Sequence, residues 1–252
     1  MKEQSIKDEI SRFLHNEGMS IFGVAAVKQL SSLPEKFSPQ MLLEGARSVI
    51  CYGVHIPKGI IYAENNNLTL YWRYCNTQYR TLDSVSNRLC LFLEEKNCSA
   101  VPVYSCFPWR IVNREFWGHL PLVYWAEEAG LGQLAKCGLL VTPQYGTRIL
   151  LGGVITTLEL EPDKKLDKDI CPSDCFDCVD VCPANAIKRT GKVDHNLCIR
   201  YSSSNPLLEL ALEKQTIRKN YSFETLLNTI AVDDHGTYSC FECLRVCPLN
   251  SK

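Results

Sequence analysis

The sequence predicts a layered protein of the α+β class, in which a mixed α/β region precedes a small cysteine-rich module. Two observations lead to this prediction. Helical and strand-like hydrophobic patterns alternate up to about residue 157, whereas eight of the fourteen cysteines fall after residue 170. With 252 residues, 46% of them hydrophobic, the chain is long enough to bury a full core.

The predicted elements follow in order. Apolar residues recur at the spacing of one helix face between positions 6 and 14, and Gly18 follows them, so a first helix is expected there. A long helix ending near Lys96 is predicted by the apolar residues at 82, 85, 89 and 92. Strands are expected at the apolar runs, which are 21–27, 48–56, 100–105, 138–141 and 148–157.

The composition changes at residues 160–169, which are charged and include a proline. Such a stretch is typical of a surface connection between domains. We therefore expect a first domain over 1–165 and a second over 166–252.

Charge and hydropathy exclude some functions. The formal net charge is -1 and no block of like charges occurs, which makes nucleic acid an unlikely partner. The first residues are amphipathic rather than a basic stretch followed by an apolar one, and no window approaches eighteen apolar residues. A cytoplasmic protein without a membrane partner is expected, and its thiols are then better suited to metal ligation than to disulfides.

Two cysteine runs have the spacing of iron–sulfur ligands. Residues 171–183 read C-x3-C-x2-C-x3-C-P, and residues 240–248 read C-x2-C-x3-C-P. Bacterial ferredoxins use C-x2-C-x2-C-x3-C-P, in which three cysteines hold one [4Fe-4S] cube and the fourth crosses to the other. The spacing therefore predicts two [4Fe-4S] clusters.

Two cubes need eight thiolates, and the second run supplies only three, so Cys198 is the expected eighth ligand. Two zinc sites would also use eight thiolates, but the asymmetric spacing favours clusters. The x3 gap after Cys171 departs from the ferredoxin pattern. The predicted ligands of one cluster are Cys171, Cys175, Cys178 and Cys247, and those of the other are Cys240, Cys243, Cys182 and Cys198.

The other six cysteines occur singly, and small buried hydrophobic side chains are the simplest interpretation of them. They are Cys51, Cys75, Cys90, Cys98, Cys106 and Cys137.

The order of three further segments carries a family resemblance. GARSVICYGVHIP (45–57) and EEAGLGQLAKCGLLVTPQYGTRILLGGVITT (127–157) precede the double cysteine tail. In this order the chain resembles the group of epoxyqueuosine reductases and reductive dehalogenases, which are corrinoid iron–sulfur proteins. The resemblance implies a nitroreductase-like α/β domain followed by a bacterial ferredoxin-like two-cluster module, with base-off cobalamin between them.

The resemblance also implies site residues. His119 and Tyr145 are the expected catalytic proton donors, although structural roles for both remain open. Tyr71, Trp72 and Tyr74 are candidates for the floor of a planar ligand site, and core packing explains them equally well. The expected cofactor-binding residues are Gly130, Gly132, Lys136, Cys137, Tyr145, Gly146 and Arg148.

The chain departs from the family pattern at several positions. The acidic Asp-x-x-Pro segment of the family is replaced by Gly118-His119-Leu120-Pro121, without a carboxylate. Gln133, Ala135 and Cys137 stand where the family has Trp, Gly and Asn around the lysine. The helical repeats that help the family hold tRNA do not follow the second cysteine run.

Because of these departures, we rank the expected functions as follows. The first is a cobalamin-dependent reductase of a small molecule, which receives electrons through the two clusters from a reduced ferredoxin or flavodoxin-type donor. The alternative is an electron-transfer or activator protein that serves a separate redox partner and has no substrate of its own. Reduction of epoxyqueuosine in tRNA is ranked last.

Overall fold

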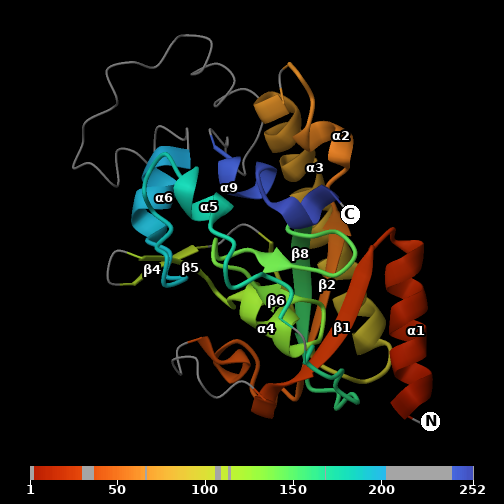
Figure 1. The fold of residues 1–252 in the computed structure, drawn as a ribbon. Helices are drawn as coiled ribbons and strands as arrows, with labels where there is room; N and C mark the ends of the chain where they lie inside the picture. The colour runs from red at the N-terminus through yellow and green to blue at the C-terminus, as the bar shows by residue number, and fades with distance from the viewer. Residues whose placement is uncertain are drawn as a thin grey trace, which may run out of the picture.

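The computed structural model describes residues 3–29, 37–65, 67–105, 109–112, 115–167, 169–202 and 240–251. These residues form a mixed α/β region with a cysteine-rich module packed at one end of it (Figure 1). Cys106 lies outside the described residues. No helix in the described part of the chain is both long and apolar enough to cross a membrane.

A four-stranded antiparallel sheet forms the centre of the mixed region, with strand order β1-β2-β8-β3. Its apolar side chains alternate between the two faces, as the period of a strand requires. Val24 and Ile50 point into one core, whereas Ala25 and Cys51 point into the other. The strands are β1 (Ile21–Ala26), β2 (Ser48–His55), β8 (Ile149–Thr156) and β3 (Ala100–Val103).

Helices α1 (Glu3–Asn16) and α3 (Asn67–Glu94) cover one face of this sheet (Figure 1). Their buried side chains include Leu14 and Leu89, which pack with Ile50 of β2 in one hydrophobic core. Gly18, with a φ of 79°, ends α1, because a residue with a side chain rarely adopts that conformation.

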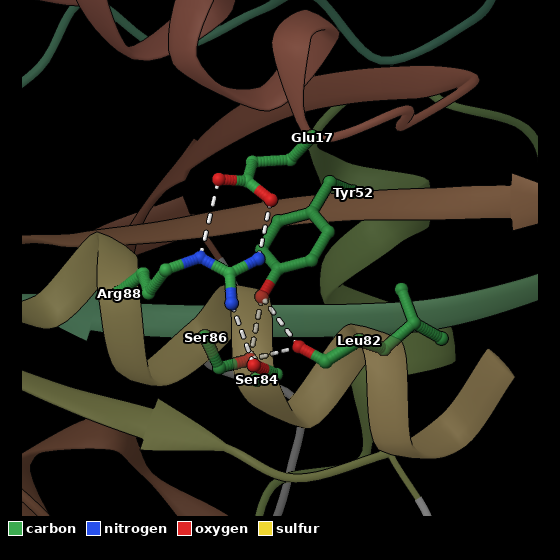
Figure 2. Close-up of polar contacts among 6 residues, drawn as sticks. All are labelled: Glu17, Tyr52, Leu82, Ser84, Ser86 and Arg88. Carbon is green, nitrogen blue, oxygen red and sulfur yellow. Dashed lines mark hydrogen bonds and ion pairs between the residues drawn. The ribbon is translucent and has the colours of Figure 1, made fainter. Parts of the chain in front are cut away.

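Polar contacts fasten α3 to the sheet and to the end of α1 (Figure 2). The Tyr52 hydroxyl of β2 lies 2.5 Å from Ser86 Oγ, which also reaches the backbone oxygen of Gly153 on β8 at 3.2 Å. Arg88 forms a two-pronged ion pair with Glu17. The long helix is thus held at both its buried and its exposed face.

The opposite face of the sheet is covered by α4 (Leu122–Glu128), whose Trp125 and Ala126 are buried in a second core. Two short hairpins flank this helix in the sequence. Their strands are β4 (Trp109–Val112) with β5 (Glu115–Gly118), and β6 (Gln133–Leu134) with β7 (Leu140–Val141). Between β2 and α3 lies the short helix α2 (Lys58–Ile61).

The cysteine-rich module contains three short helices, which are α5 (Asp177–Asp180), α6 (His195–Ser202) and α9 (Glu242–Arg245), and ends in a 3₁₀ turn, Pro248–Ser251. Phe241 and Leu244 of this module are buried in the same core as α1 and α3. The ring of Phe241 stacks on Tyr71 of α3 at a centroid distance of 4.6 Å. The module therefore shares hydrophobic core with the mixed region.

The mixed α/β character that the sequence predicts is confirmed, and the strands lie close to the expected positions. One expectation was inaccurate in extent: the run 138–141 contributes only Leu140–Val141, because Gly138 is in a turn with a φ of 79°. The long helix, of which only the end was predicted, begins at Asn67.

Candidate iron–sulfur centre and adjoining cavity

The two cysteine runs fold in the same way. In each run a phenylalanine precedes a four-residue helix, and its backbone oxygen accepts hydrogen bonds from the residues three and four positions later. After each helix, the cysteine nitrogen donates to the residue three positions earlier at 3.3 Å, in Cys182 and again in Cys247. The runs at Cys175–Cys182 and Cys240–Cys247 are therefore two copies of one loop-and-helix unit.

One group of thiols lines a small cavity of about 20 Å³. It contains the four cysteines that the sequence assigns to the first cluster, together with Cys243 and Cys137. The four assigned cysteines are Cys171, which precedes the first copy of the unit, Cys175 and Cys178 of the first copy, and Cys247 of the second.

A second group of thiols gathers around Cys198 on α6. Its electrostatic environment includes Cys182 from the first copy and Cys240 from the second. These three are ligands that the sequence assigns to the second cluster. The ligand sets stay a prediction: seven of the eight thiols lie in the expected groups, whereas Cys243, assigned to the second cluster, lines the cavity of the first group.

The donor chemistry of these groups suits iron–sulfur clusters. Across the described part of the chain, no three His, Cys, Asp or Glu side chains are arranged to hold a single metal ion. All eight expected ligands are cysteines, which is the ligand type of [4Fe-4S] clusters.

Burial raises the pKa of several thiols in the metal-free chain, including Cys198, Cys240 and Cys247. The pKa of Cys178 is also raised, first by its hydrogen bond with Cys137 and then by burial. Because iron binds thiolates, cluster assembly must displace these protons. Assembly is therefore coupled to proton release.

A buried asparagine fastens the second copy of the unit to the mixed region. Asn250 is 0% exposed, and its Oδ1 accepts a hydrogen bond of 2.8 Å from the backbone nitrogen of Thr147. Its Nδ2 donates to the backbone oxygen of Leu244 at 2.6 Å. Thr147 also hydrogen-bonds Cys247 through its side chain. The position of Cys247 is thus tied to β8.

A cavity of about 700 Å³ lies between the mixed region and the module. Its volume is in the range of small-molecule and cofactor sites, which is about 300–1,000 Å³. Leu244, next to Cys243, forms part of the wall. The lining is mainly apolar and aromatic, and it includes the side chains of Tyr71, Tyr79, Tyr104, Tyr124, Ser105 and His195.

Neither residue expected to be catalytic lines this cavity. His119 is half-buried between Gly118 and Leu120, both of which do line it. Tyr145 stacks on His55 with a centroid distance of 4.6 Å and an angle of 6°. Their catalytic roles remain predictions.

Three of the expected cofactor-binding glycines have packing roles. An added Cβ would lie 2.3 Å from the backbone oxygen of Lys164 at Gly130, and 2.4 Å from that of Val141 at Gly132. At Gly146 it would lie 2.3 Å from Asn250 Oδ1. These glycines allow close contact with the protein's own chain, and none of them lines the large cavity.

The remaining expected cofactor residues also lie away from the large cavity. Arg148 is 3% exposed and donates through Nη1 to the backbone oxygen of Ile56 at 2.5 Å. Lys136 donates to the backbone oxygen of Pro172, and its neighbour Cys137 lies among the cluster thiols. The Lys136–Cys137 pair therefore faces the iron–sulfur module.

Sequence reasoning missed most of the cavity wall. The tyrosines at 79, 104 and 124 and the segment Gly191–Val193 were not selected, and neither was Asn250. Tyr71 was considered for its aromatic ring and does line the cavity, whereas Trp72 is buried and Tyr74 donates to the backbone oxygen of His55. No sequence spacing links these residues, because they come from distant elements.

Residues 170–250 match the family model described as a 4Fe-4S double cluster binding domain. Curated relatives named epoxyqueuosine reductase confirm the predicted resemblance. The protein from Listeria monocytogenes is 35% identical over 133 residues, which are 53% of this chain and 30% of the relative. The one from Lactococcus garvieae is 28% identical over 219 residues, 87% of this chain and 56% of the relative. The chain thus spans about half the length of these relatives.

Solved structures show the same fold. An epoxyqueuosine reductase with an epoxyqueuosine-modified tRNA-Tyr stem loop superposes with a TM-score of 0.66 at 22% identity, over 99% of this chain and 66% of that chain. An epoxyqueuosine reductase from Bacillus subtilis, with its catalytic aspartate loop swung out of the active site, gives 0.64 at 21%, with the same two coverages. A catabolic reductive dehalogenase gives 0.55 at 16%, over 75% of this chain and 28% of that chain.

These comparisons correct two expectations. The ranking of a small-molecule cobalamin reductase, or an electron-transfer protein, above a tRNA enzyme is wrong, since the relatives are named epoxyqueuosine reductases. The expectation that nucleic acid is an unlikely partner is also wrong, since a structure of the same fold holds a tRNA stem loop. A net charge near zero argues only against a surface that is basic overall. A stem loop can still be bound by a local site.

Proposed function

We propose that this chain, which resembles epoxyqueuosine reductases in sequence and fold, is an iron–sulfur oxidoreductase that reduces a modified nucleoside in tRNA. Two [4Fe-4S] clusters in the C-terminal module supply the electrons. The nucleoside enters the large cavity between the module and the mixed region.

One observation supports this proposal above the others: the cavity and the proposed clusters share a wall. Leu244 lines the cavity and is next in sequence to Cys243, an expected ligand of the second cluster. Gly191–Val193 and His195 line the cavity too, and Cys198 lies one turn further along the helix of His195. A substrate in the cavity would therefore lie close to the electron source.

We further propose base-off cobalamin as the group between clusters and substrate, because a structural neighbour is a reductive dehalogenase described as B12-dependent. The residues present fit a large planar ligand. Four tyrosines line the cavity, and Ser105 Oγ on its wall is buried without a hydrogen-bond partner among the described residues. When bound, a corrinoid supplies a strongly reducing cobalt centre.

The chain's own residues would bind, orient and protonate the substrate. Tyrosine rings such as Tyr79 and Tyr104 offer flat apolar surfaces to a base, and their hydroxyl groups offer hydrogen bonds. The apolar wall, including Leu150, excludes water from the reacting atoms. His119 remains our candidate for proton delivery, since its two neighbours form part of the wall.

We also propose the finer architecture that the resemblance implies. The mixed region, residues 1–165, would be a nitroreductase-like domain, and residues 166–252 a ferredoxin-like double-cluster domain. The change of composition at 160–169 supports this boundary. Leu160 and Asp163 in the boundary segment contact the mixed region, so the connection is anchored at its beginning.

The test is an anaerobic reduction assay. Protein reconstituted with iron, sulfide and hydroxocobalamin is incubated with a reductant and a tRNA stem loop that carries epoxyqueuosine. Mass spectrometry of the nucleosides should show the reduced product, and its formation should require both iron and cobalamin. Iron-loaded protein that binds the stem loop without reducing it would contradict the proposed reaction, and iron-dependent reduction without cobalamin would contradict only the cofactor.

A further inference from the structure

The β6–β7 hairpin contacts the first cysteine loop through Gln133, which differs from the family pattern, and through Lys136. Gln133 Oε1 accepts hydrogen bonds from the backbone nitrogens of Ile170 and Cys171, at 2.7 and 3.1 Å. Lys136 Nζ lies 4.0 Å from Cys171 Sγ and donates to the backbone oxygen of Pro172. The hairpin thus holds the loop that has the unusual x3 spacing.

Cys137 is the third contact of this hairpin, and it lies among the cluster thiols. It is 8% exposed and lines the small cavity together with the expected ligands of the first cluster. Cys178 and Cys243 line the same cavity and are electrostatic neighbours of Cys137. Cys137 therefore contacts one expected ligand of each cluster.

Two cubes use eight thiolates, and Cys137 is a ninth thiol beside them. Once iron is bound, Cys178 and Cys243 have no proton and can only accept hydrogen bonds. Cys137 is not an expected ligand, so it keeps its own hydrogen and can donate it to a ligand sulfur. Hydrogen bonds to cluster sulfurs stabilise the extra negative charge of the reduced state and raise the reduction potential.

We propose that Cys137 is a positioning residue of the iron–sulfur centre, which donates its one thiol hydrogen to a ligand sulfur, that of Cys178 or Cys243, and raises the potential of the cluster that this sulfur binds. This role rests on the proposed iron–sulfur function. It differs from ligation, in which Cys137 would bind iron in place of an expected ligand. It differs also from plain packing, in which the thiol would only fill space.

The experiment compares wild type with Cys137→Ala, Cys137→Val and Cys137→Ser in the full chain. Alanine and valine remove the donor, and valine keeps the space filled if alanine leaves the protein unstable. Serine keeps a hydrogen-bond donor. The matched control is Cys90→Ala, which removes another thiol that is 8% exposed, from the core around α3.

Iron and sulfide per chain are measured first, followed by an anaerobic redox titration monitored by electron paramagnetic resonance. All variants should keep the wild-type iron content. In the alanine and valine variants, the oxidised-to-reduced ratio of at least one cluster at a fixed potential should rise about tenfold, a shift of about 59 mV to lower potential. The serine variant and the Cys90→Ala control should titrate close to wild type.

Two results would overturn the proposal. Loss of about half the iron from the alanine and valine variants would make Cys137 a ligand. If the titration curves of all variants superimposed on that of wild type, Cys137 would only fill space. A wild-type protein that takes up no iron would instead refute the iron–sulfur function itself, so the two failures are distinguishable.

Discussion

At the scale of single residues, the surroundings of a cysteine in the fold separate core thiols from cluster thiols better than its spacing in the sequence does. Cys51 and Cys75 are fully buried in hydrophobic cores, as expected for small apolar side chains. Cys137 was grouped with these at the sequence level and also with the cofactor site, yet it lies among the cluster thiols. Its sequence neighbours carry no cysteine pattern, so only the folded hairpin reveals its place.

The role of Cys198 can be tested by metal analysis. Cys198→Ala should halve the iron content of anaerobically reconstituted protein, because it removes one of four thiolates from one of two clusters. The control is Cys98→Ala, which removes a half-buried thiol beside the first core and should leave iron unchanged. Equal losses from both variants would show that the ligand assignment is wrong.

Gly146 offers a test of the contact between the module and the mixed region. Its φ is 59°, and a Cβ would lie 2.3 Å from Asn250 Oδ1, so Gly146→Ala should lower the free energy of unfolding by about 1–3 kcal/mol. Gly59→Ala is the control, since nothing lies within 4 Å of its Cβ position. Urea denaturation measures both, and equal stability of the two variants would contradict the contact.

His55 should make stability depend on pH. Burial and the nearby Arg148 guanidinium lower its pKa, so the folded protein binds this proton less readily than the unfolded chain. Its contribution is then fully present above the unfolded pKa of about 6.5 and is lost as pH falls through the lowered folded pKa. His55→Gln should flatten the decline in unfolding free energy below about pH 6.5, as measured by urea denaturation at a series of pH values. If the unfolding free energy of His55→Gln declined with falling pH as it does in wild type, this role of His55 would be contradicted.

At the scale of elements, the hydrophobic patterns predicted the strands whose positions depend on their own sequence. Strands β2 and β8 follow apolar runs that are buried along nearly their whole length, so their positions were predictable. The start of α3 was not, because its first turns carry Tyr71 and Trp72 among polar residues and are held by packing against distant parts of the chain. The cluster thiols followed from spacing, whereas the cavity wall depends on how six separate segments meet.

The segment after β8 provides a test at this scale. Asp163 accepts a hydrogen bond of 2.8 Å from the Val24 nitrogen of β1 and pairs with Lys7 of α1 at 2.9 Å. Asp163→Ala should lower the free energy of unfolding by about 1–3 kcal/mol, since it leaves a partly buried backbone donor unpaired. Asp180→Ala, which breaks the exposed ion pair with Arg189, is the control and should change stability by less than about 1 kcal/mol. Circular dichroism during denaturation measures both, and equal effects would refute the argument.

At the scale of the whole molecule, the module and the mixed region are coupled through one core. Phe241 and Leu244, on either side of Cys243, are 5% and 3% exposed and pack with residues of α3. The clusters would therefore order side chains that the mixed region needs for its own packing. The large cavity depends on the same contact, since Leu244 forms part of its wall.

Removal of the clusters should consequently destabilise more than the module. Chelator treatment of the iron-loaded protein should lower the melting temperature of the mixed region by several degrees, because the module no longer holds Phe241 and Leu244 in the core. Differential scanning calorimetry with tyrosine fluorescence measures the change. Two independent transitions, with the mixed region unaffected by the chelator, would contradict the shared core.

The paired loop-and-helix units have a consequence for synthesis of the protein. If each cube takes ligands from both copies, as the thiol groups suggest, the first copy leaves the ribosome before the remaining ligands of either cube have been synthesised. Neither inorganic group can be finished until Cys240 and Cys247 emerge about sixty residues later. Completion of both clusters would then have to wait, and the nascent thiols would need protection from oxygen and from stray metals throughout that interval.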